Sequence, residues 1–556
     1  MKFCYLPHWV QVQIPGRCDV PMARREHERI LQDTEREQGH TALRNNVRAA
    51  LALADAVRST IGPLGLDKML ISDDGDVQVT NDGVTVLEAA KVEHPTARML
   101  ISTSSVQDDE ARDGTSSAIV LTAELLVNAL DWIDRGIHPS VIVAGYRIAM
   151  NHCLIAIEDI SKPIEEADHI RIVSTSLAGK VSEEVRRILS NLAVETAAIA
   201  MKRGTSNHVN PDLIKRIIIR GGRIADCERV DGIVLRKTRL DSQTPNRLDG
   251  GKVLLLDGGL DSKELSINAS IRITEPGMMA RFLQRQKLEV KEQVDAIEKA
   301  GIDLLIVKDG IHEDAIPMLR DAGIVTYRRV ERTDLELIAR ACGARIVRDV
   351  QGIRPDSIGE FNSVIEERWE SIDHVRIHGS VGSGQTVVLR GSTDAVIDEV
   401  SRAFDDAIGV ACGLQEEPKM LPGGGAIQIA LARRLRIHAT TIPGREQLAV
   451  EAYAAALESI PRALAENSGL DGLDQIIGIT AAQTSSSNDW LGLDVIDRSI
   501  HPMNERGVLE PIRIARQAIT GATESAISVL RIGDILWAKQ DAQMPDWQSD
   551  LNQDDD

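Results

Sequence analysis

The segment QDDEARDGTSSAIVL (residues 107–121) places four acidic residues, one arginine and a run of hydroxyls directly before an apolar helix. One acidic N-cap residue would be enough to begin that helix. Free N–H groups at the positive end of a helix dipole bind phosphate well, and an adjacent carboxylate can hold Mg²⁺. The surplus of polar groups therefore suggests a bound ligand, although a capped helix with a flexible lead-in is the more common meaning of such a segment.

Other segments carry related chemistry. STIGPLGLDKM (59–69) and PGGGA (422–426) are glycine-rich turns that allow a backbone to approach a ligand closely, and they fit a helix stop or a hinge equally well. Asp82 lies in an Asn-Asp-Gly turn, a common turn sequence. Asp406 flanks the apolar stripe of a predicted helix, so it is either solvated or directed into a site. Because no GxxxxGK[ST] sequence is present, these patterns alone indicate no more than a candidate phosphate-binding protein.

The composition limits the class of protein. The chain has 556 residues, which predicts two to four domains, and a net charge of −20, which argues against a general nucleic-acid binder. No uninterrupted apolar run approaches the ~20 residues needed to span a bilayer, so no membrane association is expected. The six cysteines are scattered without metal-ligand spacing or a disulfide framework, which favours a reducing cytoplasm.

Hydrophobic periodicity predicts a helical first part, an α/β middle and a helical last part. A domain inserted into another explains this order best. Thr333 and Glu336 predict a capping box at the start of one middle helix. The predicted helices are 41–61, 117–135, 139–160, 181–203, 278–300, 312–322, 334–342, 393–413, 426–439, 444–467 and 511–530. The predicted strands of the middle part are 252–259, 269–274, 302–307, 324–330 and 344–350.

Taken together, these segments resemble the group II chaperonins, the family of the archaeal thermosome and the eukaryotic cytosolic chaperonin. The resemblance runs from about Arg36 to Ala538 and is collinear. The segments that carry it include VRSTIGPLGLDKML (57–70), VTNDGVTVL (79–87), QDDEARDGTSSAIVLTAELL (107–126), RAFDDAIGVA (402–411) and PGGGAIQIALARRL (422–435).

The resemblance implies a multi-domain chaperonin fold. A mostly α-helical equatorial domain, an α/β (α+β) intermediate domain and an α/β apical domain are expected, the last with a helical protrusion that closes the cavity as a built-in lid. The implied bounds are 1–30 for a disordered N-terminal arm, 31–163 and 422–539 for the equatorial domain, 164–234 and 387–421 for the intermediate domain, 235–386 for the apical domain and 540–556 for a disordered acidic tail.

The same resemblance implies a cytoplasmic ATPase that folds unfolded proteins inside a double ring of identical or paralogous subunits, with ATP and Mg²⁺ required. Asp82 and Asp406 are the implied catalytic residues and Asp113 the implied metal ligand. Met278, Met279 and Phe282 are candidate client contacts or ordinary packing residues. The implied nucleotide contacts are Thr60, Gly62, Pro63, Asn81, Asp113, Gly114, Thr115, Ser116, Ser117, Lys180, Gly424 and Glu510.

The chain departs from the family pattern at several positions near the implied site. Leu64 stands where the family has a basic residue, and Arg112 stands where it has glycine. A left-handed backbone at Arg112 would cost roughly 1–2 kcal/mol. One hypothesis unites the two changes: Arg112 restores the positive charge lost at Leu64. Ser116 and Ser117 replace threonines, and Gln428 replaces a common glutamate without a clear consequence.

Two alternatives to an ATP-hydrolysing subunit follow from these departures and patterns. The first is a structural ring subunit that hydrolyses ATP poorly because Leu64 and Arg112 have degraded the phosphate site. The second is a metabolic kinase or phosphotransferase that uses the glycine-rich turns on a small substrate, which predicts a monomer or dimer.

Overall fold

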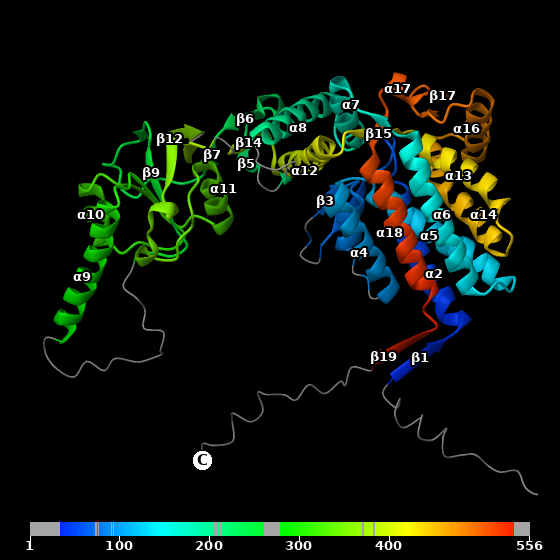
Figure 1. Ribbon diagram of the computed structural model, residues 1–556, viewed down its shortest axis with the longest axis horizontal. Coiled ribbons are helices and arrows are strands. Elements are labelled where there is room, and N and C mark those ends of the chain that lie inside the picture. The colour runs from blue at the N-terminus through cyan, green and yellow to red at the C-terminus, as the bar shows by residue number, and fades with distance from the viewer. Residues whose placement is uncertain are drawn as a thin grey trace, which may run out of the picture.

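The computed structural model describes residues 34–538 apart from 73, 74, 76, 91, 93, 204–209, 212, 213, 261–277, 370, 371, 382 and 383. Figure 1 shows a helical body at one end, an α/β part at the other, and a linking part of helices and a small sheet between them. The first and last segments of the chain pack together in the helical body, and the middle of the chain forms the α/β part.

The helical body is built around α5 (Thr115–Asp134), whose residues Ile119, Val120 and Leu125 are fully buried. Tyr146 donates a hydrogen bond to the backbone oxygen of Leu125 at 2.6 Å. Burial of this apolar surface against neighbouring helices is the main stabilising contribution. The other principal helices of the body are α2 (His40–Arg58), α3 (Gly83–Ala89), α4 (Pro95–Ala111), α6 (Pro139–Ile160), α13 (Ala426–Ala439), α14 (Glu446–Leu457), α15 (Ser459–Asn467), α16 (Gly472–Ser486), α17 (Met503–Arg506) and α18 (Ile512–Leu530).

Two of these helices, α5 and α6, are long and apolar enough to cross a membrane by length and composition, among the residues that the structure describes. The most apolar windows of α5 and α6 are 56% and 44% buried inside the protein. Core helices of globular proteins pass the same test, so this finding is weak evidence for a membrane span.

The helical body also contains short paired strands. β1 (Thr34–Gln38) pairs with β19 (Asp534–Ala538) in an antiparallel two-stranded sheet that joins the two ends of the described chain. β2 (Lys68–Ile71) and β3 (Val77–Thr80) form a second antiparallel pair. The remaining strands are β4 (Lys162–Pro163), β15 (Lys419–Pro422) and β18 (Leu509–Pro511) in one sheet, and β16 (Leu491–Asp494) and β17 (Ser499–Pro502) in another.

The linking part joins the two larger parts. Its sheet has the order β5-β14-β6, with β5 (Lys215–Arg220) parallel to β14 (Gln385–Gly391) and β6 (Glu228–Asp231) antiparallel to it. Its helices are α7 (Glu166–Ser176), α8 (Glu183–Arg203) and α12 (Asp394–Glu416). Thr393 caps α12 through the backbone N–H of Val396. Along the chain, α12 lies between β14 of the linking sheet and β15 of the helical body.

The α/β part contains a seven-stranded sheet of order β11-β10-β9-β12-β13-β7, with β8 paired to β12. β9, β10 and β11 are parallel, whereas β12 and β13 form a long antiparallel hairpin. Helices α9 and α10 cover one apolar face of the sheet and α11 covers the other. The bounds are β7 (Ile233–Leu235), β8 (Arg247–Leu248), β9 (Gly251–Leu256), α9 (Met278–Lys299), β10 (Leu304–Val307), α10 (Ala315–Asp321), β11 (Val325–Tyr327), α11 (Arg332–Cys342), β12 (Gly359–Trp369) and β13 (Ile372–Gly379).

Two local predictions for this part are wrong. Residues 344–350 form no strand, because only Val347 makes a bridge, to Leu256. The capping box is also absent: α11 begins at Arg332, one residue before Thr333, and its N-cap Glu331 makes no side-chain cap. The arm 1–30, the tail 540–556, the strand 269–274 and the side chains of Met278, Met279 and Phe282 lie outside the described residues.

Candidate active site

A cavity of about 690 Å³ lies in the helical body where α5 and α3 begin and where β18 and the 422–425 turn pass. Segments from both ends of the chain line it. Asp406 is the one predicted site residue that is absent from the lining. Those that line it are Thr60, Gly62, Pro63, Asn81, Asp82, Asp113, Gly114, Thr115, Ser116, Ser117, Lys180, Gly424 and Glu510.

The starts of α3 and α5 meet at the cavity but are capped differently. Asp82 caps α3, because its Oδ2 accepts hydrogen bonds from the N–H of Thr85 at 3.0 Å and from its hydroxyl at 2.6 Å. The N-cap of α5 is Gly114, which supplies no side-chain acceptor. The first N–H groups of α5 therefore remain available to an anion at the positive end of the helix dipole.

Glycine at two positions permits the close approach of the surrounding turns. A Cβ atom at Gly83 would lie 2.5 Å from Oγ of Ser116, so a side chain there would separate the two helix starts. Gly179 has φ +88°, and a Cβ atom there would lie 3.0 Å from the backbone oxygen of Gly62. Asn81 donates to the backbone oxygen of Gly179 at 2.8 Å, which fixes this turn beside the cavity. The residue after Gly179 is Lys180, one of the cations that line the cavity.

Lys180 reaches across to two carboxylates. Its Nζ donates to Oδ2 of Asp406 at 2.8 Å and lies 3.7 Å from Oδ1 of Asp113. Burial would lower the pKa of Lys180, but Asp406 and Asp113 outweigh burial and raise that pKa. Burial raises the pKa of Asp406 to about 7 despite the opposing effect of Lys180. A carboxyl group with a pKa near neutrality beside a phosphate-type site is suited to accept a proton.

The residues that line the cavity are chemically suited to bind a phosphate ligand together with Mg²⁺. Asp113 and the hydroxyls of Thr115 and Ser116 line the cavity, and oxygen ligands are those that Mg²⁺ prefers. Within the described part of the chain, no group of three or more His, Cys, Asp or Glu residues is placed to hold a metal ion. Mg²⁺ usually keeps several waters and takes one or two carboxylates plus substrate phosphates, so a single aspartate is sufficient.

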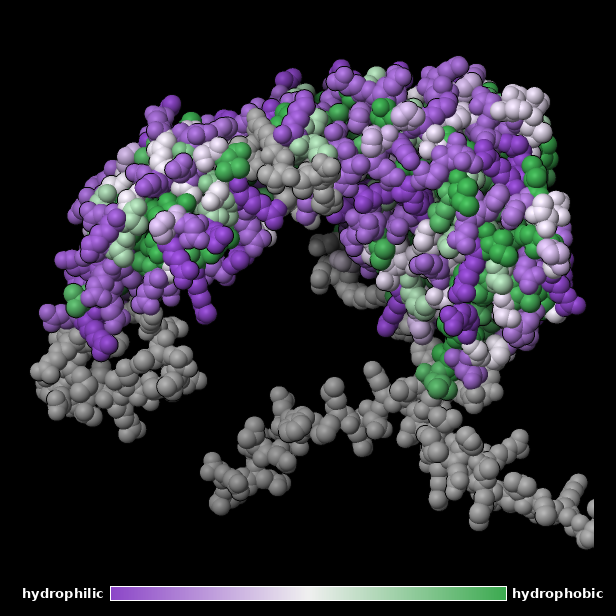
Figure 2. All heavy atoms as spheres, viewed as in Figure 1, coloured by the Kyte–Doolittle hydropathy of each residue, from purple (hydrophilic) through white to green (hydrophobic). Residues whose placement is uncertain are grey.

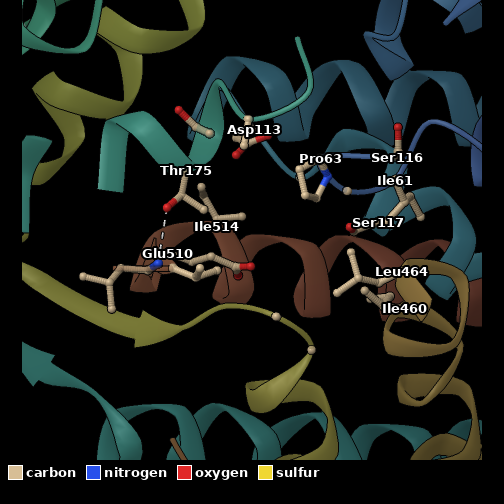
Figure 3. Close-up of a pocket in the computed structure, with 18 of the residues that line it drawn as sticks. Ile61, Pro63, Asp113, Ser116, Ser117, Thr175, Ile460, Leu464, Glu510 and Ile514 are labelled. Atoms are coloured by element: carbon tan, nitrogen blue, oxygen red, sulfur yellow. Dashed lines mark hydrogen bonds between the residues drawn. The ribbon is translucent and has the colours of Figure 1, made fainter. Parts of the chain in front are cut away.

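The cavity lining also includes polar and apolar side chains near the start of α5. Figure 3 shows Thr175 and Glu510 on one side, with Ile460 and Leu464 on the other. The N–H of Leu509 donates to Thr175 Oγ1 at 3.4 Å. Burial, aided by Asp113, raises the pKa of Glu510 to about 7. An apolar wall that faces a few polar groups can accept a flat heterocycle with an attached sugar.

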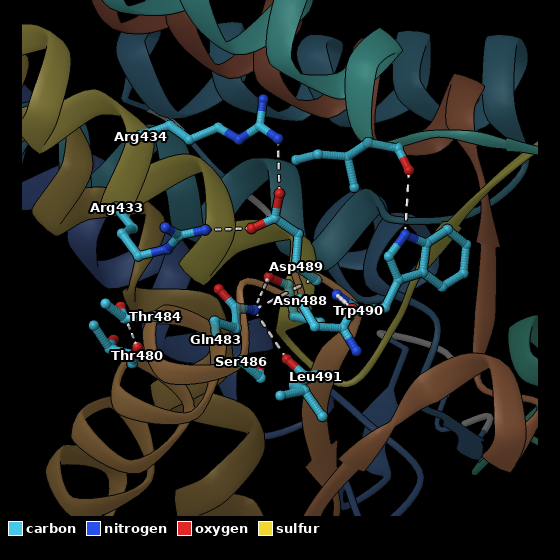
Figure 4. A network of polar contacts seen from close by, with 12 residues as sticks. Arg433, Arg434, Thr480, Gln483, Thr484, Ser486, Asn488, Asp489, Trp490 and Leu491 are labelled. Atoms are coloured by element: carbon cyan, nitrogen blue, oxygen red, sulfur yellow. Dashed lines mark hydrogen bonds and ion pairs between the residues drawn. The ribbon is translucent and has the colours of Figure 1, made fainter.

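Figure 4 shows a polar network around Gln483 and Asp489. Gln483 donates to the backbone oxygens of Ala426 at 3.0 Å and Leu491 at 2.9 Å, which ties the start of α13 to β16. Asp489 forms ion pairs with Arg433 and Arg434 of α13. These contacts hold the turn that contains Gly424 in a fixed position against the cavity.

The sequence did not point to several residues that line the cavity. Asp494 ends β16, Asp497 lies in the turn after it, and Thr175 belongs to α7. Arg506 pairs with both of these aspartates. No local pattern distinguishes these residues from ordinary surface polar residues. The sequence alone therefore did not predict that they line the cavity.

We expect Glu510→Gln to raise the apparent melting temperature of the nucleotide-free protein at pH 8 by a few degrees, and to change it little at pH 5. Burial raises the pKa of Glu510 to about 7, so the folded state keeps this proton at pH values where the unfolded state, with a pKa of about 4.5, has lost it. The free energy of unfolding therefore falls as the pH rises from about 4.5 through 7. At pH 8 the cost is up to about 3 kcal/mol. Differential scanning fluorimetry at both pH values, with exposed Glu505→Gln as control, tests this. Equal shifts at both pH values would contradict it.

Neither Leu64 nor Arg112 lines the cavity. Leu64 is 41% exposed. Arg112 does adopt the left-handed conformation expected for glycine, with φ +56°. Its guanidinium lies 3.5 Å from Asp108, and its aliphatic stem covers Gly409 of α12, where a Cβ atom would overlap it. In this structure Arg112 therefore packs the α4–α5 turn against the helix that bears Asp406.

We expect Arg112→Gly to leave ATP affinity within about threefold of wild type, because the guanidinium contacts Asp108 and lies outside the cavity lining. Arg112→Ala should melt at a lower temperature than Arg112→Gly, since both variants lose the stem packing but only alanine keeps a left-handed strain of about 1 kcal/mol. Isothermal titration with ATP and thermal melting measure the two effects. A tenfold loss of affinity in both variants would support charge compensation for Leu64.

Comparisons with known proteins cover nearly the whole chain. A model of the TCP-1/cpn60 chaperonin family matches residues 53–540. The chain is 42% identical over 515 residues to thermosome subunit alpha of Archaeoglobus fulgidus, covering 92% of this chain and 94% of that one. It is 40% identical over 514 residues to the thermosome subunit of Methanocaldococcus jannaschii, with 92% and 94% covered. It is 38% identical over 512 residues to that of Pyrococcus horikoshii, with 91% and 93% covered.

Proposed function

Because the chain belongs to the TCP-1/cpn60 chaperonin family, in its group II branch, we propose that it is an ATP-hydrolysing chaperone subunit that encloses and folds unfolded proteins. The observation that carries the ATPase proposal is the start of α5, which has no side-chain cap. It opens into a cavity of about 690 Å³ together with Asp113 and Lys180. ATP and Mg²⁺ are the proposed ligands.

The proposed roles follow from the geometry. The N–H groups and hydroxyls of Thr115, Ser116 and Ser117 bind the terminal phosphates, and Asp113 holds Mg²⁺. When bound, Mg²⁺ neutralises charge on the phosphate oxygens. Both contacts from Thr85 fall on Oδ2 of Asp82, so Oδ1 is the proposed oxygen that orients the attacking water.

Asp406 is the proposed proton acceptor. It is outside the cavity lining and is held by Lys180 at 2.8 Å. We propose that Lys180 transfers its contact from Asp406 to the terminal phosphate when ATP binds. This exchange frees the Asp406 carboxylate to accept a proton from water, and it stabilises charge on the transferring phosphoryl group.

Coupling between hydrolysis and movement is proposed to run through α12. This helix carries Asp406, and it begins directly after β14 of the linking part. A tilt of α12 that brings Asp406 to the water would also move the α/β part. ATP can drive this change only by binding one arrangement more tightly than the other.

We assign the helical body as the equatorial domain (predicted bounds 31–163 and 422–539), the linking part as the intermediate domain (164–234 and 387–421) and the α/β part as the apical domain (235–386). Strand pairing moves three of these bounds by a few residues, because β7 pairs within the α/β part, β14 within the linking part and β15 within the helical body. The assignment is supported by the separation of these parts in Figure 1, where α9 projects from the α/β part. A projecting helix is suited to serve as the built-in lid. The buried free thiols of Cys153, Cys342 and Cys412 are compatible with the proposed cytoplasmic location.

Assembly with other subunits, identical or paralogous, is supported by the surface of the helical body. Hydrophobic side chains gather there in Figure 2. Strands β2 and β3 expose Met69 by 67%, Ile71 by 70% and Val77 by 59%. Exposed apolar strands and free sheet edges are typical of surfaces that pair with another chain. The proposed partner is a neighbouring subunit in a double ring.

Two measurements test the proposal. Electron microscopy of the purified protein, with and without Mg-ATP, should show double rings of about one megadalton, and a steady-state assay should show Mg²⁺-dependent ATP hydrolysis. Rings without hydrolysis would favour the structural-subunit alternative. Leu64 and Arg112 lie outside the cavity lining, so their positions do not support that alternative. A monomer or dimer would contradict the ring.

A further inference from the structure

A second cavity of about 440 Å³ lies in the α/β part, at the meeting of three segments. Residues 236–240 follow the edge strand β7 and reach the opposite edge strand β11, where the N–H of Leu240 donates to the backbone oxygen of Thr326 at 2.9 Å. The loop after β11 and the start of β13 complete the cavity. Its charged lining residues are Arg236, Lys237, Arg239, Arg328, Arg329 and Asp373, and we call this site the basic cavity.

The positive charge of the basic cavity is only partly balanced. Arg239 forms an ion pair with Glu366. Asp373 accepts a hydrogen bond from Thr238 at 3.4 Å and lies 3.9 Å from Arg368, outside the cavity lining. The lining holds five cationic side chains. If Glu366 neutralises Arg239 and Asp373 neutralises one further cation, three positive charges remain. This excess stands out in a chain whose net charge is −20.

The fold holds these like charges together. The ammonium group of Lys237 donates to the backbone oxygen of Arg329, which ties the two basic segments to each other. Arg329 adopts a left-handed backbone with φ +56°, an unfavourable conformation for a residue with a Cβ atom. Its N–H donates to the backbone oxygen of Asp309 at 3.2 Å, which stabilises this conformation. Residues with a strained backbone are often found at ligand-binding sites.

We propose that the basic cavity binds acidic segments of polypeptides. Arginine presents a planar set of donors that matches carboxylates in two-point contacts. The lining also includes Leu240 and Ile372, which can contact the methylene groups of glutamate and neighbouring apolar side chains. Arg236, Arg328 and Arg329 are exposed, so the site is open enough for an extended chain segment to reach them. As a site that selects acidic segments of unfolded clients, it rests on the proposed chaperone function.

The test is peptide binding by the full-length protein without nucleotide. A fluorescein-labelled 12-residue peptide of alternating glutamate and leucine is titrated with protein, and fluorescence anisotropy is followed at low and high salt. Wild type should bind it with an affinity that falls as salt rises. Arg236→Glu combined with Arg328→Glu should weaken binding at least tenfold. A matched pair, Lys252→Glu with Lys291→Glu, changes the same charge at exposed positions of the same part and should stay within twofold.

Three outcomes would overturn the proposal. They are equal weakening by the control pair, equal binding of a peptide with glutamine in place of glutamate, and saturable binding of inorganic tripolyphosphate without binding of the acidic peptide. Circular dichroism and ring assembly verify that each variant is folded. ATP hydrolysis by the same preparations is measured separately, because failure of the chaperone ATPase proposal would abolish hydrolysis in wild type and leave the peptide result intact.

Discussion

Asp406→Asn should bind Mg-ATP with an affinity within about threefold of wild type and hydrolyse it at least a hundredfold more slowly. The carboxyl group is outside the cavity lining, so its removal leaves the phosphate contacts of α5 in place. Asparagine keeps the size of the side chain but cannot accept a proton from water. General-base catalysis contributes about 10²–10⁴-fold to a rate, which sets the expected loss.

The control for this variant is Asp398→Asn, the same chemical change at an exposed position of the same helix. It should keep at least half of the wild-type turnover. Binding is measured by titration calorimetry and turnover by phosphate release under saturating Mg-ATP. Near-normal turnover of Asp406→Asn would refute the role of Asp406 as the proton acceptor. A large loss of ATP affinity would instead indicate that Asp406 contributes to nucleotide binding.

Lys180→Met should lower ATP turnover at pH 7 by ten- to a hundredfold, because it also removes the proposed contact with the terminal phosphate. It should move the rising limb of the pH–rate profile to higher pH by about one unit. Burial raises the pKa of Asp406 to about 7, and Lys180 opposes that rise, so removal of the ammonium group raises the pKa of Asp406 further. A carboxyl group that must be ionised to accept a proton is active only above its pKa. Turnover therefore rises with pH in both proteins, and later in the variant.

The measurement is steady-state hydrolysis from pH 5.5 to 9.5, with exposed Lys202→Met as the control. The pH range in which the variant recovers separates two roles of Lys180. Recovery at high pH reports the electrostatic effect on Asp406, and a loss that persists at every pH reports the direct contact with the terminal phosphate. An unshifted profile would show that the titrating group is not Asp406.

Helix positions were the part of the fold that local patterns predicted best. Helix α13 occupies 426–439, as predicted from its periodicity after a glycine-rich turn. The predicted helix 444–467 is instead two helices, α14 and α15, which divide near Glu458. The hairpin of β12 and β13 was not predicted, because its partners are set by pairing across the sheet.

The sequence alone determined the chemical groups of the site, since glycine turns, the polar start of α5 and the aspartates are recognisable within short segments. Only the tertiary structure decided how those groups act on one another. Lys180 and Asp406 are 226 residues apart in the chain, and their contact exists because α12 passes beside the Gly179 turn. The raised pKa values of Asp406 and Glu510 likewise arise from burial and from neighbouring charges, which depend on packing between distant segments and have no local signature.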